Sequence, residues 1–171
     1  VLAERAAEWN WLIAGYGPEC PKIKQRIREC GLEKRVRLLG HVDYYQLPKF
    51  YSQADAYLQP SLCEPWGLAV NEAMACALPV VVSQQCGCHE DLVQENVNGF
   101  KFDATEPESM GTALDRLLAS KYRWRDMGVT SKAIIAHWGL DLYSQSLWQA
   151  CEKALSPVST GTGSRIAESL V

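Results

Sequence analysis

Two glutamates, Glu64 and Glu72, lie eight positions apart in the segment from residue 60 to residue 83. Glu64 comes directly before Pro65, and Glu72 lies within a run that is otherwise almost wholly apolar. A helix that is apolar on all sides is buried, and a buried carboxylate is costly unless hydrogen-bond donors reach it. The donors can be an Arg, a Ser or backbone amides of the same protein, or they can belong to a ligand.

The turn between the two glutamates favours a ligand. Pro65 suits the first position of a helix, and Gly67 lets a ligand approach the backbone closely. Unpaired N–H groups of residues 66 to 68 then face an anion such as a diphosphate, where the helix dipole adds roughly half a positive charge. Glu72 is placed to accept hydrogen bonds from a ribose diol, and Glu64 is placed to reach the hydroxyls of the group that the diphosphate carries. The segment therefore predicts a nucleotide-sugar site.

Strands and helices alternate along the chain around this segment. The alternation predicts a doubly wound, Rossmann-like α/β fold with a parallel sheet, whose ligands bind at the carboxyl ends of the strands. The predicted strands are residues 11–14, 36–39, 56–58, 79–82 and 100–102. The predicted helices are residues 1–8, 21–30, a helix bearing Leu47, Phe50 and Tyr51, the helix of Glu72, one turn at 89–93, a helix from Pro107 to Leu117, and 121–154 with breaks near Gly128 and Gly139.

The candidate site residues share one edge of the predicted sheet. The first four strands are followed by residues 15–18, 40–43, 60–67 and 83–87. Each glycine turn alone is a weak signal because turns need glycine anyway. Their common position at the carboxyl ends of parallel strands is the stronger observation.

Composition limits the classes of function. The chain has 171 residues, 47% hydrophobic and 22% charged, which fits one globular domain. Its net charge of -3 argues against nucleic acid as the main partner. No apolar run approaches the ~18 residues of a transmembrane helix, and no secretory signal opens the sequence. We therefore expect a cytoplasmic location, which leaves open a peripheral membrane contact of the complete protein.

The seven cysteines are odd in number and scattered, which predicts reduced thiols. Cys86, Cys88 and His89 form the sequence CGCH, but they supply at most three metal ligands, and His41 and His137 are isolated. A turn with small side chains is the favoured interpretation of CGCH. We expect no metal site.

The sequence EPWGLAVNEAMACALPVVVS, from Glu64 to Ser83, resembles nearly throughout the signature of retaining glycosyltransferases of family 4, which have the GT-B fold. The resemblance implies a nucleoside diphosphate sugar as co-substrate and no metal or other cofactor. It implies that Glu64 is the catalytic residue that contacts the donor sugar and that Glu72 binds the ribose. The implied backbone and loop contacts are Trp66, Gly67 and Leu68 with the sugar or diphosphate, Gly15, Tyr16 and Gly17 near the diphosphate, and Val42 and Asp43 at the base.

The resemblance covers only the C-terminal, donor-binding half of a GT-B protein. It implies that residues 1–154 form a nucleotide-sugar-binding domain without its first strand, and residues 155–171 are predicted to be a polar, disordered tail. The missing strand of the family carries an Arg and a Lys, and an N-terminal domain binds the acceptor. We therefore expect the fragment alone to be inactive.

Two local departures from the family pattern bear on the site and its support. Ala77 stands where the family has glycine, and a left-handed backbone there would cost ~1 kcal/mol. Tyr16 stands between two glycines where a small or acidic residue is common.

Three other classes remain open from the sequence. They are a non-catalytic nucleotide-binding module, a nucleotide-sugar epimerase of GT-B architecture, and a receiver-type signalling domain. Carboxylates on both sides of one turn favour the sugar-handling enzyme over the first. The region from Trp11 to Gly17 lacks the acidic cluster that the last would need.

Overall fold

The structure is a computed structural model that describes residues 9–155. The predicted helix over residues 1–8 and all but the first residue of the predicted tail lie outside the described residues. The chain divides into two compact units, Val1–Ala136 and His137–Val171. The first unit carries every residue of the candidate site.

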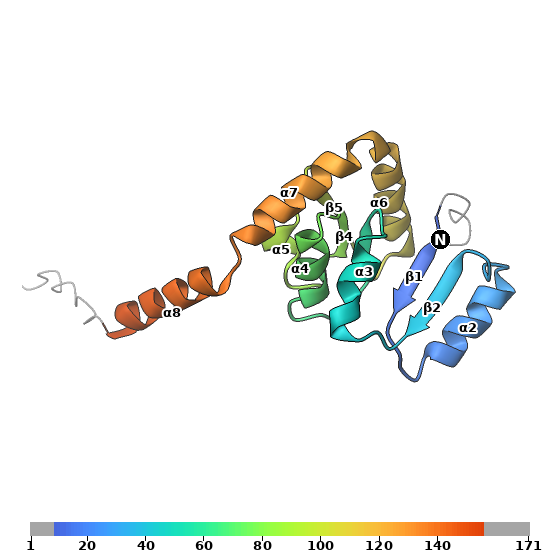
Figure 1. The fold of residues 1–171 in the computed structure, drawn as a ribbon, viewed down its shortest axis with the longest axis horizontal. Helices are drawn as coiled ribbons and strands as arrows, with labels where there is room; N and C mark the ends of the chain where they lie inside the picture. The colour runs from blue at the N-terminus through green and yellow to red at the C-terminus, as the bar shows by residue number, and fades with distance from the viewer. Residues whose placement is uncertain (1–8, 156–171) are drawn as a thin grey trace, which may run out of the picture. The chain divides into compact units, whose positions relative to one another are not determined.

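The first part of this unit is a two-stranded parallel sheet. Strand β1 (Trp11–Ala14) pairs with β2 (Val36–Gly40), and helix α2 (Cys20–Glu29) connects them (Figure 1). In β1, Leu12 is 46% exposed and Ile13 is 38% exposed, although both are apolar. A central parallel strand would be buried on both faces. Within the described residues, β1 is not buried in this way.

The second sheet has three parallel strands in the order β3-β4-β5. They are Tyr57–Gln59, Val80–Ser83 and Gly99–Phe102. The predicted fold class, α/β with parallel strands, is confirmed, but the strands form two separate sheets rather than one.

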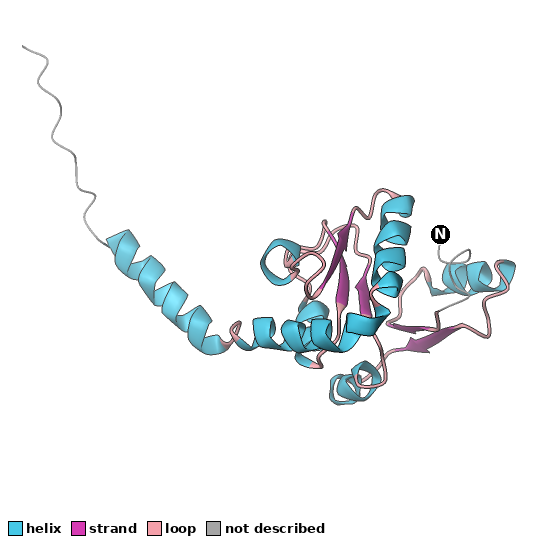
Figure 2. Ribbon diagram, turned by 90° about the horizontal axis from the view of Figure 1, so that it is seen from above, coloured by secondary structure: helices cyan, strands magenta, loops and turns pink. Residues whose placement is uncertain are grey.

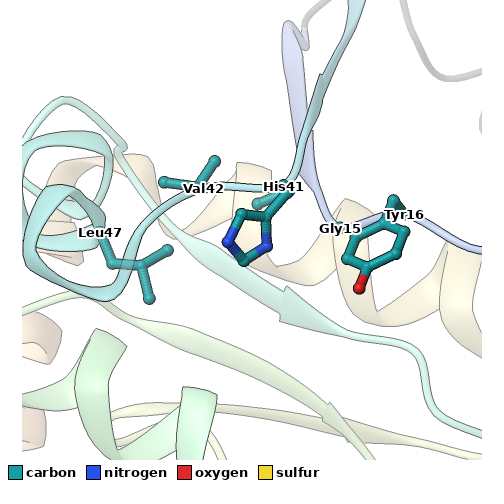
Figure 3. Close-up of a pocket in the computed structure, with 6 residues that line it drawn as sticks. Gly15, Tyr16, His41, Val42 and Leu47 are labelled. Carbon is teal, nitrogen blue, oxygen red and sulfur yellow. The ribbon is translucent and has the colours of Figure 1, made fainter.

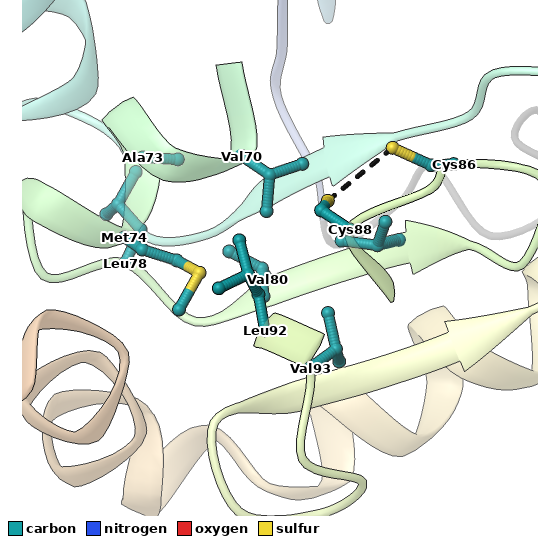
Figure 4. Close-up of a cluster of buried hydrophobic side chains, with 10 residues drawn as sticks. Val70, Ala73, Met74, Leu78, Val80, Cys86, Cys88, Leu92 and Val93 are labelled. Atoms are coloured by element: carbon teal, nitrogen blue, oxygen red, sulfur yellow. Dashed lines mark hydrogen bonds between the residues drawn. The ribbon is translucent and has the colours of Figure 1, made fainter. Parts of the chain in front are cut away.

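The alternation of side chains along β4 explains how helices cover both faces of the second sheet. Val80 and Val82 join the core cluster of α4 (Leu68–Ala75), shown in Figure 4. Val81 joins a second cluster with α6 (Pro107–Ala119). Successive side chains of a strand point to opposite faces of the sheet, so the valines of β4 are buried on both faces. Figure 2 shows the sheet between its helices.

The remaining elements are short, apart from two helices. They are η2 (Tyr44–Gln46), α3 (Leu47–Tyr51), α5 (His89–Leu92), η3 (Lys121–Arg123), α7 (Trp124–Ala136) and, in the second unit, α8 (Leu140–Leu155). Across the described part of the chain, no helix combines the length and the apolar character needed to cross a membrane.

Three expectations about α4 and α7 are corrected by the structure. Helix α4 is not buried on all sides, since Leu68 is 70% exposed. Pro65 is not its first residue, because the helix begins at Leu68 and the N-cap is Gly67. The predicted break near Gly128 is absent, because Gly128 lies buried inside α7, whereas the break near Gly139 is confirmed.

Gly128 is required by packing rather than by a turn. A Cβ atom at this position would lie 2.0 Å from the carbonyl oxygen of Ala77. Ala77, at the end of the turn after α4, has a φ of 60°, so the left-handed backbone considered from the sequence is present. The glycine therefore lets α7 approach the backbone that links α4 to β4.

Candidate functional site

The loop that carries Glu64 is fixed by backbone hydrogen bonds to the loop after β4. The Glu64 N–H donates to the carbonyl of Gln85 at 3.1 Å, and the Gly87 N–H donates to the carbonyl of Glu64 at 2.9 Å. The Cys88 N–H donates to the carbonyl of Trp66 at 3.0 Å. These bonds hold the glutamate at the carboxyl edge of the second sheet independently of any ligand.

Two glycines allow these loops to approach so closely. A Cβ atom at Gly87 would lie 2.0 Å from the carbonyl oxygen of Pro65, and one at Gly67 would lie 2.5 Å from the Cys86 Sγ. Gly67 also has a φ of 102°, which favours glycine. The turn before α4 is therefore fitted tightly over the loop that contains Cys86.

The CGCH sequence forms the support of this turn. Cys86 and Cys88 are fully buried with their Sγ atoms 3.6 Å apart, and Cys86 Sγ donates to the carbonyl of Trp66 at 3.0 Å. Burial raises the pKa of Cys86, and it raises the pKa of Cys88 to about 12. Within residues 9–155 no three His, Cys, Asp or Glu side chains are grouped as a metal site. Cys86 and Cys88 therefore pack in the core as neutral thiols.

The carboxylate of Glu64 bonds to its own turn. The Trp66 N–H donates to Glu64 Oε1 at 3.3 Å, so this predicted ligand contact has an internal partner here. The Trp66 indole N–H also donates to Asn71 Oδ1 at 3.1 Å, which ties the turn to the first turn of α4. Gly67, the N-cap of α4, is buried, whereas Leu68, the first residue of α4, is exposed.

Glu72 is half-buried, and its partner is a tyrosine that the sequence did not indicate. The hydroxyl of Tyr51, at the end of α3, donates to Glu72 Oε2 at 2.9 Å. Within residues 9–155, the donor is thus a phenol rather than the Arg, Ser or backbone amide expected from the sequence. Burial first, and then the neighbouring Tyr57 and Glu72, raise the pKa of Tyr51 far above its usual value. The phenol therefore stays protonated and can act as a donor.

Tyr57 on β3 packs beside the tyrosine that holds Glu72. Its ring centroid is 5.8 Å from that of Tyr51, and its hydroxyl donates to Gln59 Oε1. Burial first, and then the charges of neighbouring groups that include Glu72 and Glu64, raise the pKa of Tyr57. The Tyr57 phenol therefore stays protonated. The available sequence signal was an aromatic residue two positions before the polar Gln59 on one short strand.

A chain of hydrogen bonds continues from Tyr57 across the ends of the strands. Gln59 Nε2 donates to Ser61 Oγ at 2.7 Å, and Ser83 Oγ donates to the carbonyl of Ser61. The segment after β3 is thereby joined to the buried end of β4. This joining fixes the segment that leads from β3 to Glu64.

A second part of the candidate site lies where β1 and β2 end. An open hollow of about 310 Å³ is lined by Ala14, Gly15, Tyr16, His41, Val42 and Leu47 (Figure 3). The Gly15 N–H donates to the carbonyl of Gly40 at 2.8 Å, which fixes the two loops side by side. The Tyr16 and His41 rings meet edge to face with centroids 5.7 Å apart. The structure therefore brings Gly15, Tyr16 and Val42 together at one hollow, while their contacts with a diphosphate and a base stay predictions.

Two predicted residues lie beside the hollow rather than on its lining. Gly17 uses its carbonyl to accept the N–H of Cys20 at 3.1 Å, at the start of α2. Asp43 Oδ1 lies 3.7 Å from His41 Nε2, and both side chains are about 70% exposed. Leu47, on the next helix, takes part in the lining although the sequence did not mark it for this role.

The chain belongs to the glycosyl transferases group 1 family, whose profile matches residues 1–133. It is the GT-B, nucleotide-sugar-binding domain of such a protein. An uncharacterised glycosyltransferase of Methanocaldococcus jannaschii is 32% identical over 142 residues, covering 83% of this chain and 34% of the relative. The GDP-mannose-dependent alpha-(1-6)-phosphatidylinositol monomannoside mannosyltransferase of Mycolicibacterium smegmatis is 28% identical, over 82% of this chain and 37% of the relative. The chain thus spans roughly a third of the length of these relatives.

Solved structures agree on the fold. Sucrose-phosphate synthase from Thermosynechococcus elongatus matches with a TM-score of 0.73 at 25% identity, over 89% of this chain and 41% of that protein. Anabaena HepE, in complex with UDP, matches with a TM-score of 0.74 at 24% identity, over 89% of this chain and 43% of that protein.

Proposed function

We propose that the protein containing this chain transfers a hexose from a nucleoside diphosphate sugar to an acceptor, with retention at the anomeric carbon, and that this chain binds the donor. Family membership supports the class of reaction. The relatives named above act with GDP-mannose in one case and bind UDP in another. GDP-mannose and UDP both contain a nucleoside diphosphate but differ in the base. The choice of base and sugar is therefore a property of this chain's own site.

The observation that supports the proposal is that the candidate residues lie at or near the carboxyl ends of parallel strands in both sheets. The base occupies the hollow beside Val42, with Asp43 at its rim. Glu72 accepts hydrogen bonds from the ribose hydroxyls. The carboxyl ends of the strands are where ligands bind in open α/β sheets.

The diphosphate lies at the N-terminus of α4, close to the turn of Gly15, Tyr16 and Gly17. The first N–H groups of an α-helix lack partners within the helix, so those near Gly67 and Leu68 are available to an anion. When the bond to the sugar breaks, negative charge grows on the diphosphate. A fixed helix N-terminus stabilises that charge more strongly than the charge of the ground state, which lowers the barrier.

Glu64 holds the hydroxyls of the donor sugar. Its carboxylate accepts the N–H of Trp66, so binding a sugar exchanges or shares this bond. Its loop is fixed by backbone bonds on both sides, which suits a residue that positions a reacting group. We assign it positioning of the sugar rather than proton abstraction.

The acceptor is bound by a part of the protein outside this chain. The short coverage of the relatives supports this assignment. The pairing of the strands supports it too. Strands β1 and β3 belong to different sheets and do not pair with each other, and a doubly wound strand order has room for one more parallel strand between them. We place there the strand whose Arg and Lys contact the diphosphate in the family.

The test is calorimetric titration of the complete protein with UDP, GDP and the corresponding sugar donors. Glu72→Ala should weaken both the free nucleoside diphosphate and the intact donor by ~1 to 3 kcal/mol, because a charge-assisted hydrogen bond is lost. Glu64→Gln should spare the free nucleotide and should reduce donor affinity and turnover. Glu19→Gln is the matched control, since that side chain is 62% exposed and forms a surface ion pair with Lys22.

Equal losses for Glu64→Gln and Glu72→Ala with the free nucleotide would show that the two roles are misassigned. No loss for Glu72→Ala would make Glu72 a structural carboxylate whose partner is Tyr51.

A further inference from the structure

Helix α3 touches both halves of the candidate site. Leu47, its first residue, lines the hollow at the ends of β1 and β2. Tyr51, its last residue, donates to Glu72 on α4. Residues four apart lie on the same face of a helix, so Leu47 and Tyr51 present one continuous face to the two halves.

The Tyr51 hydroxyl can hold Glu72 without blocking a ligand. An ionised carboxylate offers about four acceptor positions over its two oxygens. The Tyr51 bond uses one of them on Oε2, which leaves Oε1 and part of Oε2 for a diol. A glutamate without such a donor samples several rotamers, and fixing one of them on binding costs entropy.

The tyrosine is itself held in place. Its ring packs edge to face on Tyr57 and against the buried cluster that includes Val70 and Met74. Loss of the hydroxyl alone therefore leaves the ring contacts intact. Tyr51→Phe isolates the hydrogen bond.

We propose that Tyr51 is a positioning residue that presets the Glu72 carboxylate for the ribose. This inference rests on the proposed function, in which Glu72 binds the ribose. It adds a residue that never touches the ligand but determines how well the ligand's diol is recognised.

The experiment is a cycle between Tyr51→Phe and the 2′-hydroxyl of the ligand, measured by calorimetry on the complete protein. The probes are UDP or GDP, whichever the unmodified protein binds more tightly, and its 2′-deoxy form. Tyr51→Phe should weaken the ribonucleotide about tenfold, as the loss of one charge-assisted bond would. It should weaken the 2′-deoxy form less than about threefold, because the contact that Tyr51 supports is already incomplete.

Tyr122→Phe is the matched control, since Tyr122 lies on η3 and is 84% exposed. It should change neither affinity. Thermal unfolding of each variant, measured beside the titrations, shows whether the ring packing has survived.

Equal losses for the two probes would show that Tyr51 is only structural and would overturn the inference, as would unchanged affinity for the ribonucleotide. The Glu72→Ala variant tests the proposed function independently of Tyr51→Phe. If Glu72→Ala weakens the ribonucleotide while Tyr51→Phe does not, the ribose contact stands and the role of Tyr51 falls. If neither variant weakens it, both fall.

Discussion

Gly128→Ala should destabilise the protein although alanine is the better helix former. A methyl group at Gly128 would meet the carbonyl oxygen of Ala77 at 2.0 Å and its carbon at 2.8 Å. Close carbon–oxygen contacts settle at about 3.3 Å or more, so α7 or the turn after α4 must move by over an ångström. Both sides of the contact are backbone, which cannot rotate away as a side chain would.

The expected size follows from two opposing terms. Overpacking costs about 1 to 3 kcal/mol, and a backbone clash of this depth belongs at the upper end. Alanine recovers about 1 kcal/mol of helix propensity relative to glycine. The free energy of unfolding should therefore fall by roughly 2 kcal/mol, which corresponds to a drop of about 4 to 8 °C in melting temperature for a domain of this size.

Urea and thermal unfolding, followed by circular dichroism, measure this change. Gly17→Ala is the matched control, because nothing lies within 4 Å of the added Cβ and its φ is not in the left-handed range. That variant should be neutral or slightly more stable, since alanine restricts the unfolded chain. If Gly128→Ala unfolds at the same urea concentration as Gly17→Ala, the close approach of α7 to Ala77 does not exist in solution.

Two further predictions concern the support of the site. Ala77→Gly should raise the free energy of unfolding by roughly 0.5 kcal/mol, because relief of the left-handed strain at φ 60° exceeds the entropy cost of glycine; lower stability in the same urea titration would contradict the strain. In the folded protein at pH 8, iodoacetamide should modify exposed Cys63 and Cys151 well before buried Cys86 and Cys88. The pKa of Cys88, raised by burial to about 12, leaves only ~0.01% thiolate at that pH, and peptide mass spectrometry that finds all four modified at one rate would refute the buried pair.

The local patterns of the sequence predicted the fold class, which is confirmed, and placed the candidate residues at the ends of strands. The valine run at β4 predicted a strand buried on both faces, and it is buried there because its side chains alternate between two cores. Glycines followed by polar residues after successive strands predicted a shared edge, and Gly15, Tyr16 and Val42 meet in one hollow. Such patterns are readable because the period of a strand and the backbone demands of a turn are set within a few residues.

Other features were decided only by tertiary contacts. Gly128 was predicted to break a helix. The structure shows that a glycine is needed there because the carbonyl group of a distant turn lies against it. Pro65 looked like a helix start, but the left-handed backbone of Gly67 moved the start to Leu68. The partner of Glu72 is Tyr51, on a helix that precedes β3. The sequence named the carboxylate because its burial is costly, whereas the donor that meets that cost depends on which helices pack together, a property of the whole fold rather than of any one segment.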